Sequence, residues 1–237
     1  VPNNAMLVVV GAVTREQVEA AAKKWFGAIP RGEAPPRPAD ASPEPKQTEK
    51  RRKVVEPGQI GLIVGGYHIP EGKHKDIYAL QLASVILGAG ESSRLHQRLV
   101  SGEKVSVQAA APILVREHPG LFALFAAYLD PGQSDKIEAL LADEVAKLRR
   151  APVTARELAK AKNQLLSAFV FSLEGVAGVA QRIGTSWIQT GDPAAWLSSI
   201  ERFNAVTVAD IQRVANAYLT ENNSTVVVIP PRGATGK

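Results

Sequence analysis

The chain has 237 residues, of which 45% are apolar and 22% are charged, and its formal net charge is +5. A chain of this length and composition buries roughly 70% of the surface that its unfolded form exposes, which excludes an intrinsically disordered protein. It contains no cysteine, which excludes disulfides, thiolate zinc sites and cysteine nucleophiles. No apolar run approaches the ~20 residues of a membrane span, so we expect no membrane-spanning segment.

Residues 1–27 have the pattern of a strand followed by a helix. Residues 6–10 are a continuous apolar run of strand length. Thr14 with Gln17 three residues later predicts a capping box at the start of a helix, which Gly27 ends. So short a piece cannot bury both elements, so we expect it to pack on another domain. The chain does not begin with Met and its first residues lack signal-peptide features, so we expect any export signal to lie upstream.

Residues 28–58 are a proline-rich linker that contains seven of the sixteen prolines. Within it, Lys50, Arg51, Arg52 and Lys53 form the one dense basic run. Glutamates flank this run and no aromatic residue is available to stack on a base, so we interpret it as a solvated linker and expect no nucleic-acid partner.

Residues 59–230 contain the pattern of a larger domain, and residues 231–237 are a tail. Strands are predicted over residues 52–55, 59–68, 105–115, 121–129 and 225–229. Helices are predicted over residues 76–87 and 92–100, along an amphipathic stretch from 137 to 148, after capping boxes that begin at Thr154 and Thr207, and over 176–201 with a break at Gly191-Asp192-Pro193. Strands, then a run of helices, then a strand indicate an α+β fold with a mixed or antiparallel sheet packed against a layer of helices.

The sequence contains one pair of similar segments, which we call the internal echo. Paired asparagines precede a hydrophobic run at residues 3–10 and again at residues 222–229, an offset of 219 residues. Two readings stay open. The echo is either the remnant of a duplicated domain of about 200 residues or ordinary turn chemistry before a strand.

No catalytic or metal-binding pattern is found among the residues themselves. His68, His74, His96 and His118 stand in none of the paired-histidine zinc motifs, so we expect no catalytic residue and no metal ligand in this chain. Gly65-Gly66 lies inside a predicted strand, where glycine indicates a bulge or a close backbone approach.

The order of the motifs resembles that of the pitrilysin/insulinase-type zinc metallopeptidases, which include mitochondrial processing peptidase. Residues 2–30 are similar to the end of the catalytic domain in that family. Asp76-Ile77-Tyr78-Ala79-Leu80, followed by Ile86-Leu87-Gly88 and Ser92-Ser93-Arg94-Leu95, resembles the signature of the second, non-catalytic domain. The resemblance implies that residues 1–27 are the last strand and helix of an upstream catalytic domain and that residues 59–230 are the non-catalytic C-terminal domain.

The resemblance also implies a function. The full-length protein is expected to be a zinc-dependent endopeptidase in which this half forms part of an enclosed chamber for peptides or unfolded polypeptides. The zinc and its inverted His-x-x-Glu-His motif are expected in the upstream catalytic domain or partner subunit, so this chain alone is expected to be inactive. Bacterial members are often exported, which implies the periplasm or cell envelope. The alternative is a non-catalytic structural or assembly subunit.

One departure from the family pattern concerns the chamber. Active members often carry an Arg and, seven residues later, a Tyr that assist substrate binding, and the matching positions here hold Val100 and Val107. A valine side chain cannot donate a hydrogen bond to a peptide carbonyl. Arg94, Val100 and Val107 are therefore the candidate residues of the chamber wall, with Arg98 and Lys104 as further donors nearby.

Overall fold

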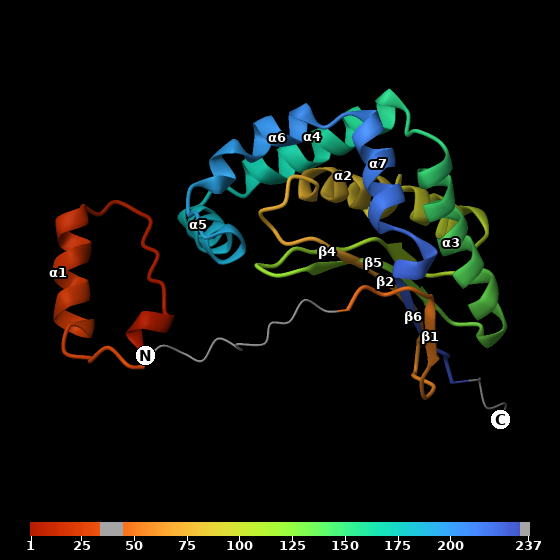
Figure 1. The fold of residues 1–237 in the computed structure, drawn as a ribbon, viewed down its shortest axis with the longest axis horizontal. Helices are drawn as coiled ribbons and strands as arrows, with labels where there is room; N and C mark the ends of the chain where they lie inside the picture. Colours follow the sequence, from red (N-terminus) through yellow and green to blue (C-terminus); the bar gives the residue numbers. More distant parts are fainter. Residues whose placement is uncertain (34–44, 233–237) are drawn as a thin grey trace. The chain divides into compact units, whose positions relative to one another are not determined.

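The computed structural model describes residues 1–33 and 45–232 (Figure 1). The chain divides into two compact units. The first contains Val1–Pro45 and Ala168–Leu197, and the second contains Lys46–Ser167 and Ser198–Lys237. We describe each unit by itself. The predicted linker falls partly on residues 34–44 and the predicted tail largely on residues 233–237, and these lie outside the described residues.

The second unit is built on a six-stranded sheet with the strand order β1-β6-β2-β5-β3, and β4 also pairs with β5. β1 runs parallel to β6, and all the other pairs are antiparallel. The strands are β1 (Arg51–Val54), β2 (Gly61–Ile69), β3 (Gln108–Ala110), β4 (Ile113–Leu114), β5 (Gly120–Tyr128) and β6 (Ser224–Ile229). The first strand lies inside the stretch that the prolines mark as a linker.

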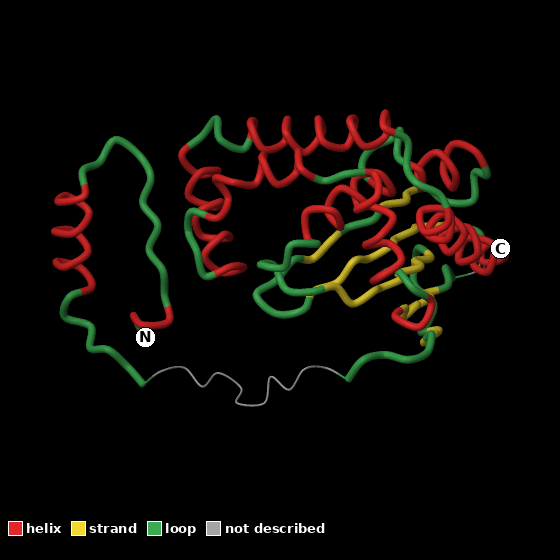
Figure 2. Tube along the Cα trace, turned by 45° about the horizontal axis from the view of Figure 1, so that its top comes forward, coloured by secondary structure: helices red, strands yellow, loops and turns green. Residues whose placement is uncertain are grey.

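Helices cover one face of this sheet, as Figures 1 and 2 show. α2 (Ile77–Gly88) and α3 (Ser134–Arg150) both pack on α7 (Val208–Tyr218), and all three helices pack on the central strands. Along β2 burial alternates strictly, because every second side chain points to the helices. The unit also contains α6 (Ser199–Ala205) and most of α4 (Ala155–Phe171). These observations confirm the α+β expectation.

The core lies between the sheet and the three packed helices. Its largest fully buried side chains include Tyr128, Phe122, Ile63, Leu80, Leu82, Leu87, Leu95, Leu99, Leu124, Ile137, Leu148 and Ile211. A core of this size stabilises the second unit mainly through the removal of apolar surface from water.

The first unit contains η1 (Pro2–Asn4), α1 (Arg15–Phe26), the last turn of α4 and α5 (Val176–Thr190). The capping box between Thr14 and Gln17 is formed as predicted, and Gly191 ends α5 in the left-handed conformation with φ of 76°. The strand expected over residues 6–10 is wrong, because this segment belongs to no sheet in the described residues. An apolar run becomes a strand only where a neighbouring strand accepts its hydrogen bonds.

The two asparagine pairs of the internal echo have the same local structure. Asn3 and Asn4 end a 3-10 turn, η1, and Asn222 and Asn223 end another, η5 (Glu221–Asn223). Only the second turn leads into a paired strand, β6. The likeness of the two segments therefore extends from sequence to local conformation.

No single helix in residues 1–33 and 45–232 is long and apolar enough to cross a membrane. One pair of helices, α4 and α5, passes the same test of length and composition together, with a bend of 116° at the break between them.

Candidate functional site

The sequence-predicted chamber residues lie in the segment that joins α2 to the sheet. Gly90 leaves α2 with φ of 76°, and the chain then forms η2 (His96–Gly102). The helix expected over residues 92–100 is present in part as η2, which is a π-helix in which the Glu103 N–H donates to the Arg98 carbonyl at 2.9 Å. π-Helical segments are rare in proteins, and those that occur are often found at functional sites. Lys104 follows with φ of 54°.

Arg94 is engaged in an ion pair. Its Nε donates to Glu157 Oε1 at 2.8 Å, and the two side chains are 22% and 32% exposed. Glu157 also completes the predicted capping box of α4, where Glu157 Oε2 accepts from the Thr154 N–H at 2.8 Å. The hydrogen bond from Arg94 lowers the pKa of the Glu157 carboxyl to about 2, against the opposing effect of burial and with further help from Thr154. The ion pair of Arg94 therefore joins the start of α4 to the residues just before η2.

Val100 and Val107 occupy different environments. Val100 is half-buried and packs against the core, whereas the side chain of Val107 is 56% exposed. The Val107 N–H donates to the Ala127 carbonyl at 2.8 Å, which aligns the chain for β3. The three candidate chamber residues therefore make separate contacts and do not form one cluster: Arg94 pairs with Glu157, Val100 packs on the core and Val107 is bonded to β5 through its backbone.

The two further donors also differ. Arg98 lies 3.3 Å from Glu103, a carboxylate that Lys136 contacts at 2.9 Å. Lys104 is exposed, and no ion pair to its ammonium group is found within the described part of the chain. Lys104 is thus the donor that remains available to a ligand on this segment.

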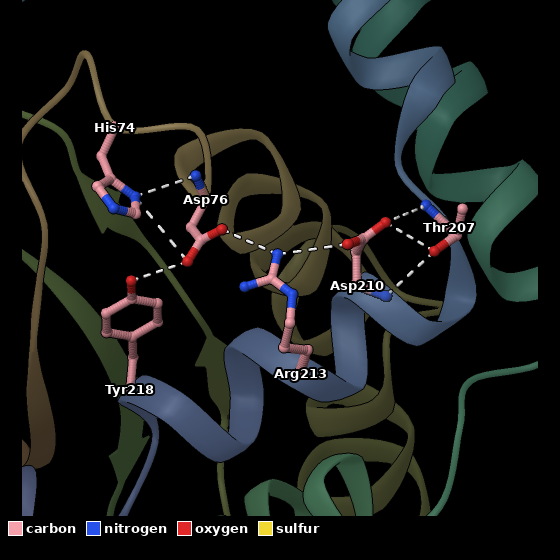
Figure 3. Close-up of polar contacts among 6 residues, drawn as sticks. All are labelled: His74, Asp76, Thr207, Asp210, Arg213 and Tyr218. Carbon is pink, nitrogen blue, oxygen red and sulfur yellow. Dashed lines mark hydrogen bonds and ion pairs between the residues drawn. The ribbon is translucent and has the colours of Figure 1, made fainter.

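A buried carboxylate that the sequence analysis missed lies at the start of α2 (Figure 3). Asp76 is 4% exposed and accepts hydrogen bonds from Arg213 Nη2 and from the Tyr218 hydroxyl, both at 2.8 Å. The Asp76 N–H donates to His74 Nδ1 at 3.2 Å. Arg213 also contacts Asp210 at 3.3 Å. Asp210 forms the capping box of α7 together with the N-cap residue Thr207.

Both oxygens of the Asp76 carboxylate in this cluster already accept hydrogen bonds, so the cluster has a structural role. Burial alone would raise the pKa of the Asp76 carboxyl, but the hydrogen bonds from Arg213 and Tyr218 outweigh burial and lower it. Burial and Asp76 together raise the pKa of the Tyr218 hydroxyl to about 12. Both groups therefore keep one protonation state near neutral pH, and the cluster ties the loop before α2 to α7. The sequence signal was an acidic residue immediately before an apolar helix.

A comparison with known families decides what this arrangement belongs to. A family model described as Peptidase M16 inactive domain matches residues 1–165, more than half of the chain. The chain belongs to this family.

The chain is similar to zinc protease PqqE of Helicobacter pylori, with 33% identity over 235 residues that make up 97% of this chain and 52% of that protein. Its fold is similar to the crystal structure of a protease from Helicobacter pylori, with a TM-score of 0.82, 28% identity and coverage of 94% of this chain and 54% of the other. A peptidase M16 inactive domain from Pseudomonas fluorescens has a TM-score of 0.81 at 19% identity, over 96% and 54% of the two chains. The chain therefore spans about half the length of these proteins.

The described residues of this inactive domain do not form a site for a zinc ion. In residues 1–33 and 45–232, no three His, Asp or Glu side chains form a group that could hold a metal. His74 lies 3.9 Å from Asp76, but that carboxylate already accepts from Arg213 and Tyr218. We therefore derive no chemical step through a metal in this chain.

Proposed function

We propose that this chain is the non-catalytic half of a zinc-dependent metalloendopeptidase and forms part of the wall of a chamber that encloses peptides or unfolded polypeptides. The observation that carries the proposal is the match of residues 1–165 to the Peptidase M16 inactive domain. The 33% identity to a zinc protease of twice the length supports it. In this proposal the zinc and its ligands belong to an upstream catalytic domain or a partner subunit, and the protein acts in the bacterial periplasm or cell envelope.

The π-helical segment η2 and the residues after it are the proposed contribution of this half to the chamber wall. Arg94 and Arg98 are held by carboxylates, Val100 packs on the core and Val107 offers no polar atom from its side chain. Lys104 is exposed in a left-handed conformation at the end of the segment. We assign the positioning of a peptide backbone or carboxylate to Lys104 and a structural role to the other four.

The test compares this chain alone with the polypeptide encoded by the complete reading frame. Both are assayed with a quenched fluorogenic peptide, with and without a zinc chelator. We expect no cleavage by this chain and chelator-sensitive cleavage by the complete polypeptide. Zinc-dependent cleavage by this chain alone would contradict the proposal. Absence of cleavage by a folded, zinc-loaded complete polypeptide would favour the structural or assembly subunit instead.

Substitutions in the complete polypeptide test the assignment of Lys104. We expect Lys104→Ala to raise KM about tenfold, while Arg98→Ala changes it less than twofold because Arg98 is paired with Glu103. Lys104→Gly is the matched control for the backbone, because glycine adopts the left-handed conformation without strain. Equal activity of wild type, Lys104→Ala and Lys104→Gly would contradict a role for the ammonium group.

A further inference from the structure

A cavity of about 220 Å³ lies between α3 and the helix-covered face of the sheet. Its apolar walls come from both layers, with Leu124 and Val226 on the strands and Leu141 and Val145 on α3. No part of the proposed chamber wall lines this cavity, since η2 and the residues that follow it are not among its lining residues. The cavity is therefore separate from the site described above.

Gly65 forms part of the floor of the cavity. It lies on the buried face of β2, where Ile63 and Tyr67 flank it. The strand pairs with β5 in continuous register through Gly65 and Gly66, so the expected bulge is wrong. The expected close approach is wrong as well, because a Cβ atom added at Gly65 would meet only Leu124 Cβ, at an ordinary 3.8 Å. Gly65 instead leaves space in the core, and the cavity occupies that space.

One buried polar atom without a partner lines the same cavity. Arg149 Nε is buried and has no hydrogen-bond partner among the described residues. Tyr67, a residue only 7% exposed, also lines the cavity. The carbonyl of Arg149 accepts from Gln212 Nε2 at 3.1 Å and from Asn216 Nδ2 at 3.0 Å, which fixes the end of α3 against α7. An unpaired buried polar atom costs free energy, so Arg149 Nε calls for a ligand that pairs with it.

Four charged residues line the cavity, namely Lys50, Glu138, Arg149 and Glu221. Lys50 and Glu138 neutralise each other at 2.8 Å, whereas Arg149 forms no ion pair within the described part of the chain, so its guanidinium group is available to an anion. Burial raises the pKa of the Tyr67 hydroxyl to about 12, and of the two charges that act on it Arg149 has a larger effect than Glu221. Tyr67 therefore stays protonated at neutral pH and is a hydrogen-bond donor next to a guanidinium group.

We propose that this cavity is a binding site for a small carboxylate that carries an apolar body, with the carboxylate at Arg149 and Tyr67 and the body over Gly65. A planar guanidinium fork matches a carboxylate in geometry and charge, and the apolar walls match an aliphatic chain. The ligand is either a free small acid or the C-terminal residue of a peptide, since both present the same chemistry. The proposal does not depend on the proposed peptidase function.

The test is an NMR titration of the folded 237-residue chain with N-acetyl-leucine and with N-acetyl-leucine amide. We expect saturable shifts of the Gly65 and Tyr67 amide signals with the acid and at least tenfold weaker binding of the amide, which lacks the charge. We expect Arg149→Gln to weaken binding of the acid at least tenfold. Absence of saturable shifts with the acid, or equal binding of acid and amide, would overturn the proposal.

Two matched glycine variants separate the cavity from general effects on the sheet. Gly65→Val fills the floor of the cavity, whereas Gly66→Val adds the same side chain on the opposite face of β2, where a Cβ atom meets nothing closer than 3.9 Å. We expect Gly65→Val to weaken binding at least tenfold and Gly66→Val to leave it within twofold, with both variants folded by their NMR spectra. Unchanged binding by Gly65→Val would overturn the proposal.

A third titration, with the peptide Gly-Gly-Leu, identifies the source of the carboxylate. Tighter binding of the peptide than of N-acetyl-leucine would support the site as one for peptide C-termini. Binding of N-acetyl-leucine with exclusion of the peptide would support it as one for free acids. Failure of both compounds to bind would refute the site itself.

Discussion

The ion pair between Arg94 and Glu157 gives a prediction that tests whether Arg94 is structural or available to a substrate. The pKa of Glu157 is lowered from 4.5 to about 2. Each pKa unit corresponds to about 1.4 kcal/mol, so the full shift corresponds to at most about 3.5 kcal/mol of stability at neutral pH. Because the Glu157 side chain is 32% exposed, solvent screening reduces this value, and we expect about 1–2 kcal/mol.

The direction of the pH dependence follows from the lowered pKa. The unfolded chain takes up a proton at Glu157 near pH 4.5, whereas the folded chain does so only near pH 2. The stabilisation is therefore present above pH 4.5 and is lost progressively as the pH falls toward 2. Urea unfolding at pH 7 and pH 3 measures this loss.

Two substitutions isolate the ion pair from the helix cap. Glu157→Gln removes the charge but keeps a side chain that caps, as Gln17 does for Thr14 in the same chain. Arg94→Met removes the partner and keeps the length of the side chain. We expect the free energy of unfolding at pH 7 to fall by about 1–2 kcal/mol in each single variant. We expect the double variant to lose no more than either single variant, because each substitution alone already removes the interaction of the pair. Arg98→Met, at a more exposed pair, is the control and should cost less than about 0.5 kcal/mol.

Two results would refute this reasoning. One is that the losses of stability in the two single variants add up in the double variant. The other is that Arg94→Met leaves stability at pH 7 and its pH dependence unchanged, which would mean that the ion pair does not exist in solution. Arg94 would then be a free cation next to η2 and would have to be tested as a substrate-binding residue.

The remaining predictions concern side chains that the structure places in the core or on its surface. We expect Val100→Ala to cost about 1 kcal/mol and Val107→Ala less than about 0.5 kcal/mol in urea unfolding, with cleavage by the complete polypeptide within a few-fold of wild type. Asp76→Asn should cost about 2 kcal/mol at pH 7, because it weakens two hydrogen bonds to a charged acceptor. Since the pKa of Asp76 is lowered, the difference between this variant and wild type should shrink as the pH falls below about 4. Gly88→Ala should cost about 3 kcal/mol, because its Cβ atom would lie 2.0 Å from a backbone nitrogen just after β3, whereas Gly66→Ala should be tolerated.

Local signals were read correctly from the sequence because they depend on a few neighbouring residues. The capping boxes at Thr14, Thr154 and Thr207 each join residues three positions apart, and all three are formed. The strand expected over residues 105–115 is instead divided into β3 and β4. Pro112 lies at the division, and a residue without an N–H cannot continue a ladder of hydrogen bonds.

Non-local features were beyond sequence reasoning for a different reason. Tyr218 is 142 positions from Asp76 and Arg213 is 137 positions away, so no spacing rule connects them. The cavity over Gly65 depends in the same way on α3, which is far from β2 in the sequence. The glycine was visible in the sequence, but only the fold shows that it leaves space in the core.

The signature that marks the family is built from residues whose polar groups are used within the fold. Asp76 is saturated by Arg213 and Tyr218, and Arg94 is held by Glu157. Tyr78, inside the same signature, packs edge-on against Phe203 with ring centroids 5.1 Å apart. These side chains therefore stabilise contacts within the fold of this chain.

It follows that the signature is evidence for the fold and that activity has to be tested at other residues. Lys104 is the residue that separates the two cases, because it lies outside the signature and its ammonium group has no ion pair within the described part of the chain. An effect of Lys104→Ala on KM without an effect on unfolding would show a contribution of this half to substrate binding. A loss of stability without a change in KM would instead show that Lys104, like Arg94, serves the fold.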